Sequence, residues 1–296
     1  METTRDPERM QCMEVWGGNV RVERHFQMTG LEVWISSQPE GRAIAGGDVY
    51  YLSSCSSGRI IRILLADVSG HGGIVARTAA GLRDLMRQNI NVISQRRFVA
   101  AMNRQFSATS RDEDFATAIV CSFFAPTRSL SLCNAGHPHP LLFRAARNEW
   151  TPLTLSDTPI KSADNVTDLP LGIDGQSGYQ QLTTRLDKGD MVLCYSDAFT
   201  DARGIDGKAL SVDGMLQAAA SIQRTDEQAL ISSLVAAIRA LHPENLTQDD
   251  ATIVLFRANG TRTSIRDNLL APFRFFGKVS DVSQIVTGQG HSLAKG

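Results

Sequence analysis

The chain has 296 residues, of which 42% are hydrophobic and 21% are charged, and its formal net charge is −1. This near-neutral balance excludes proteins that bind nucleic acid or anionic membranes mainly through a strong positive charge. No apolar run approaches the roughly 18–20 residues of a membrane span, and the polar N-terminus is no secretory signal, so we expect a cytoplasmic protein.

The five cysteines are odd in number, and none shows the CxxC or Cys/His spacing of a metal site. Three of them, Cys121, Cys133 and Cys194, fall inside apolar runs that are typical of strands. A free thiol behaves as a small hydrophobic side chain in such a place. We therefore predict reduced, buried cysteines.

The first third of the chain predicts strands followed by helices. Residues 1–30 have no clear pattern and are expected to be irregular. Apolar runs predict strands at 31–37, 48–54 and 59–68. Apolar residues then recur at helical spacing and predict helices over 72–93 and 96–108.

The remainder returns to strands and ends in a second helical block. The runs 116–124, 129–135 and 140–146 predict an antiparallel meander, and 125–128 is its first turn. Further strands are predicted at 179–186, 190–197 and 251–258. Helices are predicted from near Ser211 and from Thr225, where Thr-Asp-Glu-Gln forms a capping box.

Strands precede and follow the helices without regular β–α alternation, which predicts an α+β fold with antiparallel sheets and helices layered on them. We expect an N-terminal extension (1–30), one domain (31–258) and a C-terminal tail (259–296). Within the tail only 269–279 has an apolar stretch. It either packs back on the domain, which we favour, or docks a partner.

Acidic residues occur repeatedly where predicted strands begin or end. Asp48 follows two glycines, Asp67 and Asp197 end apolar runs, and Asp249 and Asp250 precede the last strand. Converging carboxylates would repel one another unless cations neutralised them. Oxygen-only ligands suit hard divalent ions, and two such ions can activate a water molecule for attack on a phosphoryl group.

Each of these residues also has a simpler interpretation. A single Asp at a strand end is commonly a turn former or a helix cap, and Asp67 could cap the helix that follows it. His71 could be a loop residue that forms hydrogen bonds, or a ligand or base. His137 could shape the site or serve only the fold, and we assign His139 to the surface or a turn.

Six ordered motifs carry a resemblance to a known family: GGD (46–48), ADVSGHG (66–72), NAGHPHPLLF (134–143), LPLGI (169–173), LCYSDAFTDA (193–202) and DDATIVLF (249–256). Their order resembles that of PPM-type metal-dependent Ser/Thr protein phosphatases, and most of all the SpoIIE-type bacterial sigma-regulator branch. The resemblance implies two antiparallel β-sheets in a sandwich flanked by α-helices, an αββα arrangement.

The resemblance also implies roles for individual residues. Asp67 would bridge two Mn²⁺ or Mg²⁺ ions, with Val68 offering its backbone carbonyl. Asp48 would reach the ions partly through water, and Asp197 and Asp249 would bind the second ion. The nucleophile would be a metal-bridging water rather than a side chain, with supporting roles for His71, His137 and Asp250.

This sequence departs from the family pattern in several places. Tyr51 stands where relatives often have a second Asp, and Asp201 stands where they usually have Glu. Ala198 replaces a glycine that follows the third acidic residue, so its methyl group could weaken activity. The phosphate-binding arginine of eukaryotic members has no clear counterpart; Arg42 is a candidate, although a surface role is the simpler interpretation.

The implied function is hydrolysis of phosphoserine or phosphothreonine in a phosphoprotein. In this branch the substrate is usually a STAS-type anti-anti-sigma factor, with no nucleic acid or membrane involved. One alternative is a weakly active or inactive module with the same fold that binds a phosphoprotein. Another is a phosphatase for small phosphate esters. The oligomeric state is left open.

Overall fold

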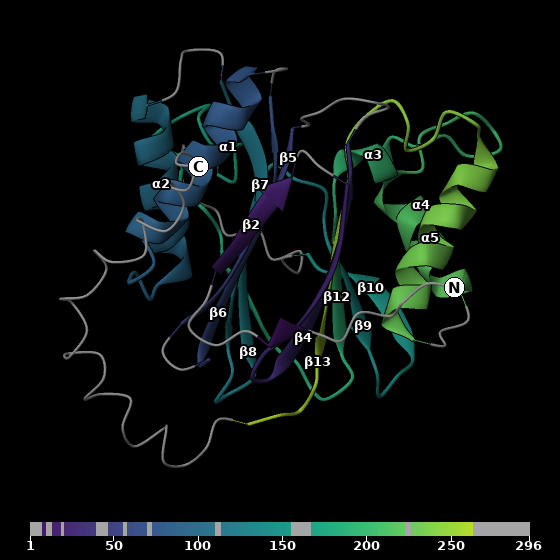
Figure 1. The fold of residues 1–296 in the computed structure, drawn as a ribbon, viewed down its shortest axis with the longest axis horizontal. Coiled ribbons are helices and arrows are strands. Elements are labelled where there is room, and N and C mark those ends of the chain that lie inside the picture. Colours follow the sequence, from purple (N-terminus) through teal and green to yellow (C-terminus); the bar gives the residue numbers. More distant parts are fainter. Residues whose placement is uncertain are drawn as a thin grey trace, which may run out of the picture.

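The computed structural model describes residues 8–9, 14–18, 21–39, 47–55, 58–69, 73–109, 114–154, 167–222 and 226–262. Two β-sheets lie face to face, and helices cover the outer face of each sheet (Figure 1). The predicted α+β sandwich of antiparallel sheets is therefore confirmed. One strand pair, β1 with β3, is parallel.

The seven-stranded sheet contains, in spatial order, β1 (Glu8–Arg9), β3 (Val22–Gln27), β4 (Leu31–Gln38), β13 (Ala251–Ala258), β12 (Met191–Tyr195), β9 (Leu141–Arg144) and β10 (Glu149–Pro152). The six-stranded sheet contains β11 (Leu182–Arg185), β8 (Ser129–Ala135), β7 (Ala116–Phe124), β6 (Ile60–Val68), β5 (Asp48–Cys55) and β2 (Glu14–Gly18).

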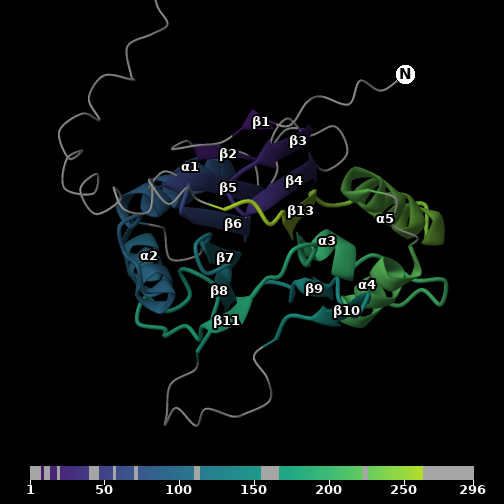
Figure 2. The ribbon, with the colours of Figure 1, turned by 90° about the horizontal axis from the view of Figure 1, so that it is seen from below.

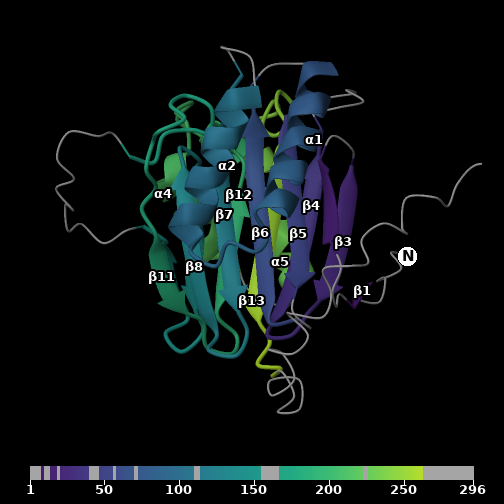
Figure 3. The same cartoon turned by 90° about the vertical axis from the view of Figure 1, so that its left-hand side faces the viewer.

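Two helical blocks cover the sandwich on opposite sides (Figure 2). On the six-stranded sheet lie α1 (Gly73–Gln88) and α2 (Gln95–Thr109), which Figure 3 shows in front of the strands. On the seven-stranded sheet lie α3 (Asp197–Thr200), α4 (Ser211–Ser221) and α5 (Glu227–Leu241). Among the described helices, none is long and apolar enough to cross a membrane.

Three apolar clusters fill the layers between these elements. One lies between the sheets, one beneath α1 and α2, and one beneath α3, α4 and α5. Alternation along the strands decides which side chain enters which cluster. In β6, for example, Ile63 and Leu65 face the opposite sheet, whereas Leu64 and Ala66 face the helices.

The cysteine prediction holds where the structure describes these side chains: Cys121, Cys133 and Cys194 are buried and free. Burial raises the pKa of the Cys133 thiol to about 12, so it stays protonated. These residues serve the core and take no part in the acidic site.

Of the expectations for the two ends of the chain, one needs correction. Residues 1–30 are not irregular throughout, because β2 pairs with β5 and β3 pairs with β4. The division of the chain into extension, domain and tail stays a prediction. The tail segment 269–279 lies outside the described residues.

The predicted meander of three strands is wrong at its third strand, β9. β7 and β8 form the predicted hairpin, but β9 pairs with β12 in the other sheet. The residues between β8 and β9 thus carry the chain from one sheet to the other. At α5 the N-cap is Asp226, whose side chain accepts a 2.7 Å hydrogen bond from the Ala229 amide. Thr225, the predicted cap, lies outside the described residues.

Candidate metal centre

At one end of the sandwich the inward-facing positions change from apolar to polar. Along β6 the inward side chains run from Ile63 and Leu65 to Asp67. Along β13 the same alternation takes Phe256 and Val254 to Thr252. The strands therefore end their buried runs on groups that cannot stay in an apolar core without partners.

Asp48 and Asp67 face each other at this end. They are direct partners in the antiparallel pairing of β5 and β6. Asp48 is only 2% exposed, and its Oδ2 atom has no hydrogen-bond partner. Burial raises the pKa of Asp48 well above its usual range, hydroxyl hydrogen bonds from Thr252 and Ser196 oppose that rise, and the charge of Asp67 adds to it.

Asp67 is the electrostatic centre of the cluster. Burial raises its pKa to about 7, and the charges of Asp197, Asp249 and Asp250 contribute to that rise. The pKa of Asp197, the first residue of α3, is also raised, first by burial and then by the charge of Asp249. The predicted carboxylates therefore come from four separate strand ends and lie near enough to repel one another.

Asp250 has a different task from its neighbours. Its Oδ2 atom accepts hydrogen bonds from the backbone amides of Gly47 and Asp48, the latter at 3.4 Å. The Asp250 amide itself donates to Asp249 Oδ1 at 2.8 Å. Asp250 is buried whereas Asp249 is exposed. Asp250 thus ties the start of β13 to the start of β5 and leaves Asp249 at the surface.

Gly47 is the point of closest backbone approach to these groups. A Cβ atom at Gly47 would lie 2.8 Å from Asp67 Oδ1, 3.0 Å from the Val68 carbonyl oxygen and 3.7 Å from Asp250 Oδ2. The Val68 amide donates to the Gly47 carbonyl at 3.1 Å. Only glycine leaves this space free, so two oxygen atoms from β6 and one from Asp250, just before β13, surround one small cradle.

The donor set fits a hard divalent cation. All nearby groups are carboxylate or carbonyl oxygens, which are the ligands such ions prefer. The unpartnered Oδ2 of Asp48 and the cradle at Gly47 are the features that a cation or its water molecules would satisfy. Within the described part of the chain, no three His, Cys, Asp or Glu side chains form a complete ligand cluster as they stand.

His137 lies in the segment between β8 and β9, next to β7. It is 4% exposed, and its Nδ1 atom is 2.8 Å from the hydroxyl of Thr117, the strand partner of Asp67. Burial lowers the pKa of His137 to about 4, and the Tyr195 backbone opposes this only in part. His137 is therefore neutral at physiological pH, and its supporting role stays a prediction.

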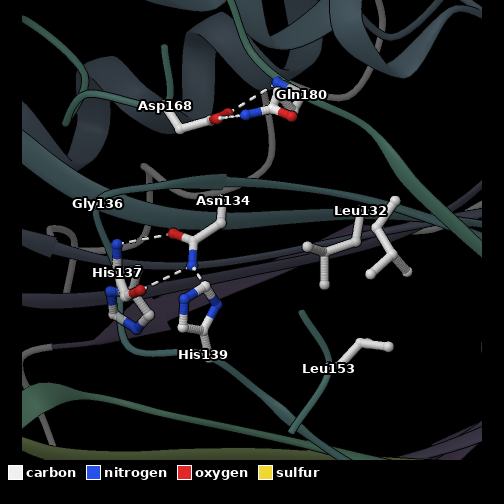
Figure 4. Close-up of a pocket in the computed structure, with 9 residues that line it drawn as sticks. Leu132, Asn134, Gly136, His137, His139, Leu153, Asp168 and Gln180 are labelled. Carbon is white, nitrogen blue, oxygen red and sulfur yellow. Dashed lines mark hydrogen bonds between the residues drawn. The ribbon is translucent and has the colours of Figure 1, made fainter. Parts of the chain in front are cut away.

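Asn134 holds the segment that contains His137 (Figure 4). Its Oδ1 accepts from the His137 amide and its Nδ2 donates to the His137 carbonyl, both at 2.8 Å. These residues line a cavity of about 360 Å³. His139 lies at this cavity and is exposed, in keeping with a turn position. Asp168 and Gln180 bond to each other across its rim.

The remaining predicted positions divide into two groups. His71 and Arg42 lie outside the described residues. Ala198 is buried in the apolar cluster beneath α3, α4 and α5, so its methyl group has a packing role. The Tyr51 hydroxyl donates to Glu14 Oε2 at 3.0 Å, away from the acidic groups. Asp201 is exposed at the end of α3, and its amide bonds to the Asp197 carbonyl.

Sequence reasoning missed the hydroxyl groups that serve the carboxylates. Ser196 Oγ donates to the Asp250 carbonyl at 3.1 Å and accepts from the Thr252 amide at 3.0 Å. Thr252 Oγ1 lies 2.9 Å from Ser37 Oγ. The sequence signal that could have identified Thr252 is a polar residue at an inward position of β13, a strand that is otherwise apolar.

A known protein family matches the part of the chain that contains most of these residues. The family model of stage II sporulation protein E (SpoIIE) matches residues 57–259. No curated protein gives a significant sequence match.

Several solved structures share the fold. The RsbU and RsbW domains of Rv1364c from Mycobacterium tuberculosis align with a TM-score of 0.59 and 23% identity, covering 82% of this chain and 69% of that one. The phosphatase domain of SpoIIE from Bacillus subtilis, with a fragment of its regulatory domain, aligns at TM-score 0.63 and 16% identity, covering 79% and 65%. RsbX in complex with magnesium aligns at 0.57 and 15%, covering 80% and 99%.

Proposed function

This chain belongs to the SpoIIE family of PPM-type phosphatases, and from that membership we propose that it is a Mn²⁺- or Mg²⁺-dependent phosphoprotein phosphatase. The reaction is hydrolysis of phosphoserine or phosphothreonine. The observation that carries the proposal is the convergence of Asp48, Asp67, Asp197 and Asp249 from separate strand ends. A conserved fold alone would not require so many acidic groups in one place.

The proposed ligands are those that the family resemblance implies. Asp67 would bridge the two ions, with Val68 offering its backbone carbonyl. Asp48 would reach the ions partly through water, and Asp197 and Asp249 would hold the second ion. When bound, two divalent cations lower the pKa of a shared water molecule and orient it for in-line attack on phosphorus. Support comes from the raised pKa values of Asp48, Asp67 and Asp197, because nearby cations would stabilise their charged forms.

The neighbouring residues keep these ligands in place. Asp250 holds the backbone of Gly47 and Asp48, and the hydroxyls of Ser196 and Thr252 hold the Asp48 carboxyl group. His137 contributes a neutral, buried imidazole that is bonded to Thr117. No side chain is assigned as nucleophile, so the proposal includes no phosphoenzyme intermediate.

The proposed substrate is a phosphorylated STAS-type anti-anti-sigma factor, by family resemblance. We also propose a cytoplasmic location, which agrees with buried free thiols at Cys121, Cys133 and Cys194. The alternative is a phosphatase-fold module that binds the phosphoprotein without hydrolysing it. The departure at Ala198 is the reason to keep this alternative under test.

Phosphate release from a phosphorylated STAS protein separates the two functions. We expect release in the presence of Mn²⁺ and none in EDTA, and the exposed Asp187→Asn variant serves as a matched control that retains activity. Stable co-elution of the phosphoprotein with no release in Mn²⁺ or Mg²⁺ would support the binding module. Release from p-nitrophenyl phosphate alone would support a phosphatase for small esters.

A further inference from the structure

A second cavity, of about 320 Å³, lies between α5 and the outer face of the seven-stranded sheet. Its lining combines apolar side chains, such as Phe199, Ile231 and Leu246, with serine and glutamine side chains, and Arg21 and Arg239 provide positive charge along it. The groove exists because α5 presents Ile231, Val235 and Arg239 on one face at intervals of four residues. This face of α5 therefore carries two apolar side chains, Ile231 and Val235, followed by the guanidinium group of Arg239.

Arg239 forms no ion pair with a carboxylate among the described residues. One guanidinium nitrogen, NH2, donates to Gln38 Oε1 at 2.7 Å. Its Nε is buried without a hydrogen-bond partner, and no ion pair to Arg239 occurs among the described residues. Arginine stays charged at every physiological pH, and a buried donor without an acceptor costs free energy. A carboxylate would satisfy both the charge and the planar donor fork.

Arg257, whose Nε is likewise buried without a hydrogen-bond partner, shows how the same fold pairs a comparable arginine with carboxylates. Its NH2 pairs with Glu32 Oε2 and its NH1 with Glu227 Oε1, both at 2.5 Å. Arg257 lies on β13, close to the base of α5, so the two arginines share the same layer of the structure. One has two carboxylates, and the other has only a neutral amide.

The other charges of the groove favour an anionic occupant. Arg21 is exposed at the rim and has no ion pair within the described ranges. Glu23, also exposed, is the one acidic residue among the lining residues that the structure describes. Among the described lining residues, two arginines against one glutamate leave a net positive charge, and apolar side chains such as Ile231 and Leu246 offer contacts to an apolar side chain of a ligand. The groove matches a segment that carries both acidic and apolar side chains.

The groove adjoins the candidate metal centre. Ala251, which lines the groove, directly follows Asp250, and Phe199 lies two residues after Asp197 in α3. A protein whose phosphorylated residue reaches the carboxylate cluster can therefore place a neighbouring segment along α5. We propose that this groove docks an acidic, partly apolar segment of the phosphoprotein partner, with Arg239 binding an Asp or Glu carboxylate. The identity of that partner as substrate rests on the proposed function, but the binding itself does not.

Fluorescence anisotropy with the full chain tests this docking. The probe is a fluorescein-labelled ten-residue peptide with four Glu and two Leu. EDTA is present so that divalent metal ions cannot bind the peptide. We expect saturable binding that Arg239→Gln weakens at least about tenfold and that Arg239→Lys restores in part, because Lys keeps the charge without the fork. Arg97→Gln, an exposed helical arginine on α2, is the matched control and keeps wild-type affinity.

Several results would overturn the docking site. These are no binding by the folded wild type, equal binding by Arg239→Gln, and equal binding of a peptide with Gln in place of Glu. Turnover of p-nitrophenyl phosphate is measured in parallel with Mn²⁺ in place of EDTA, because Arg239 has no assigned role in hydrolysis. Arg239-dependent binding without turnover would reject the proposed function and keep the groove, whereas turnover without Arg239-dependent binding would reject the groove alone.

Discussion

Asp48 lies directly opposite Asp67 in the pairing of β5 with β6, so two acidic side chains share the end of one buried ladder. Like charges at such positions destabilise a sheet unless a proton or a cation neutralises them. Here burial and the neighbouring carboxylates raise the pKa of Asp67 to about 7. Protons and metal ions therefore compete for the same carboxylate near neutral pH.

Mn²⁺ binding is expected to release protons in a pH-dependent way. Below pH 7 Asp67 is largely protonated, and the ion must displace that proton; well above pH 7 the carboxylate is already free. Calorimetric titration in two buffers of different ionisation enthalpy should give at least about one proton released at pH 6 and fewer at pH 8.5. Asp67→Asn should lose both the release and most of the affinity. Release that does not change with pH would contradict this account.

Gly47→Ala should disable the site with little effect on the fold. The added Cβ would lie 2.8 Å from Asp67 Oδ1 and 3.0 Å from the Val68 carbonyl, so the oxygen cradle must move. We expect Mn²⁺-dependent turnover to fall at least about tenfold, since small displacements of reacting groups have effects of that size. Gly81→Ala in α1 is the control: nothing lies within 4 Å of its Cβ, and it should keep activity and gain up to about 1 kcal/mol of stability. Equal activity of both variants would argue against the cradle.

His137 should make the metal-free protein sensitive to acid. Its pKa is about 4 in the folded chain and about 6.5 when unfolded. The neutral buried form therefore stabilises the fold above pH 6.5, and this contribution is lost as pH falls toward 4. Urea unfolding at pH 7.5 and pH 5 should show that the wild type loses on the order of 2 kcal/mol more than His137→Gln. His139→Gln, at an exposed position, should behave as the wild type, and an identical pH response in the His137 variant would count against this role.

Ala198→Gly tests whether the departure from the family pattern obstructs the site. Because Ala198 packs in the apolar cluster beneath α3, α4 and α5, removal of its methyl group should lower the free energy of unfolding by about 1 kcal/mol. Turnover should stay within about twofold of the wild type, as expected for a change outside the reacting groups. A gain of tenfold or more would mean that the methyl group restricts the metal centre.

The elements that could be predicted from the sequence are those whose buried residues form a local run or alternation of apolar side chains. The run 116–124 is apolar enough to predict β7, and the polar stop at Asp67 marks the end of β6. β3 was missed because its sequence, VERHFQ, alternates weakly at a sheet margin. Cross-strand contacts support it instead, such as the stacking of His25 on Trp34 with ring centroids 4.4 Å apart.

The same limit applies to the site. Acidic residues at strand ends could be recognised one by one, because each follows or precedes an apolar run. That Asp250 bonds the amides of Gly47 and Asp48 depends on two segments about 200 residues apart in sequence, and no local pattern carries it. The transfer of β9 to the other sheet was equally hidden, because its strand pattern fits either partner.

Hydrolysis of p-nitrophenyl phosphate with added Mn²⁺ tests whether these carboxylates form a two-metal hydrolase. The wild type is compared with Asp67→Asn, Asp249→Asn and the exposed control Asp187→Asn, all checked for folding by circular dichroism. We predict Mn²⁺-dependent turnover in the wild type and the control, and a loss of at least about a hundredfold in the two site variants. A folded wild type without turnover in Mn²⁺ or Mg²⁺, or site variants as active as the control, would contradict the account.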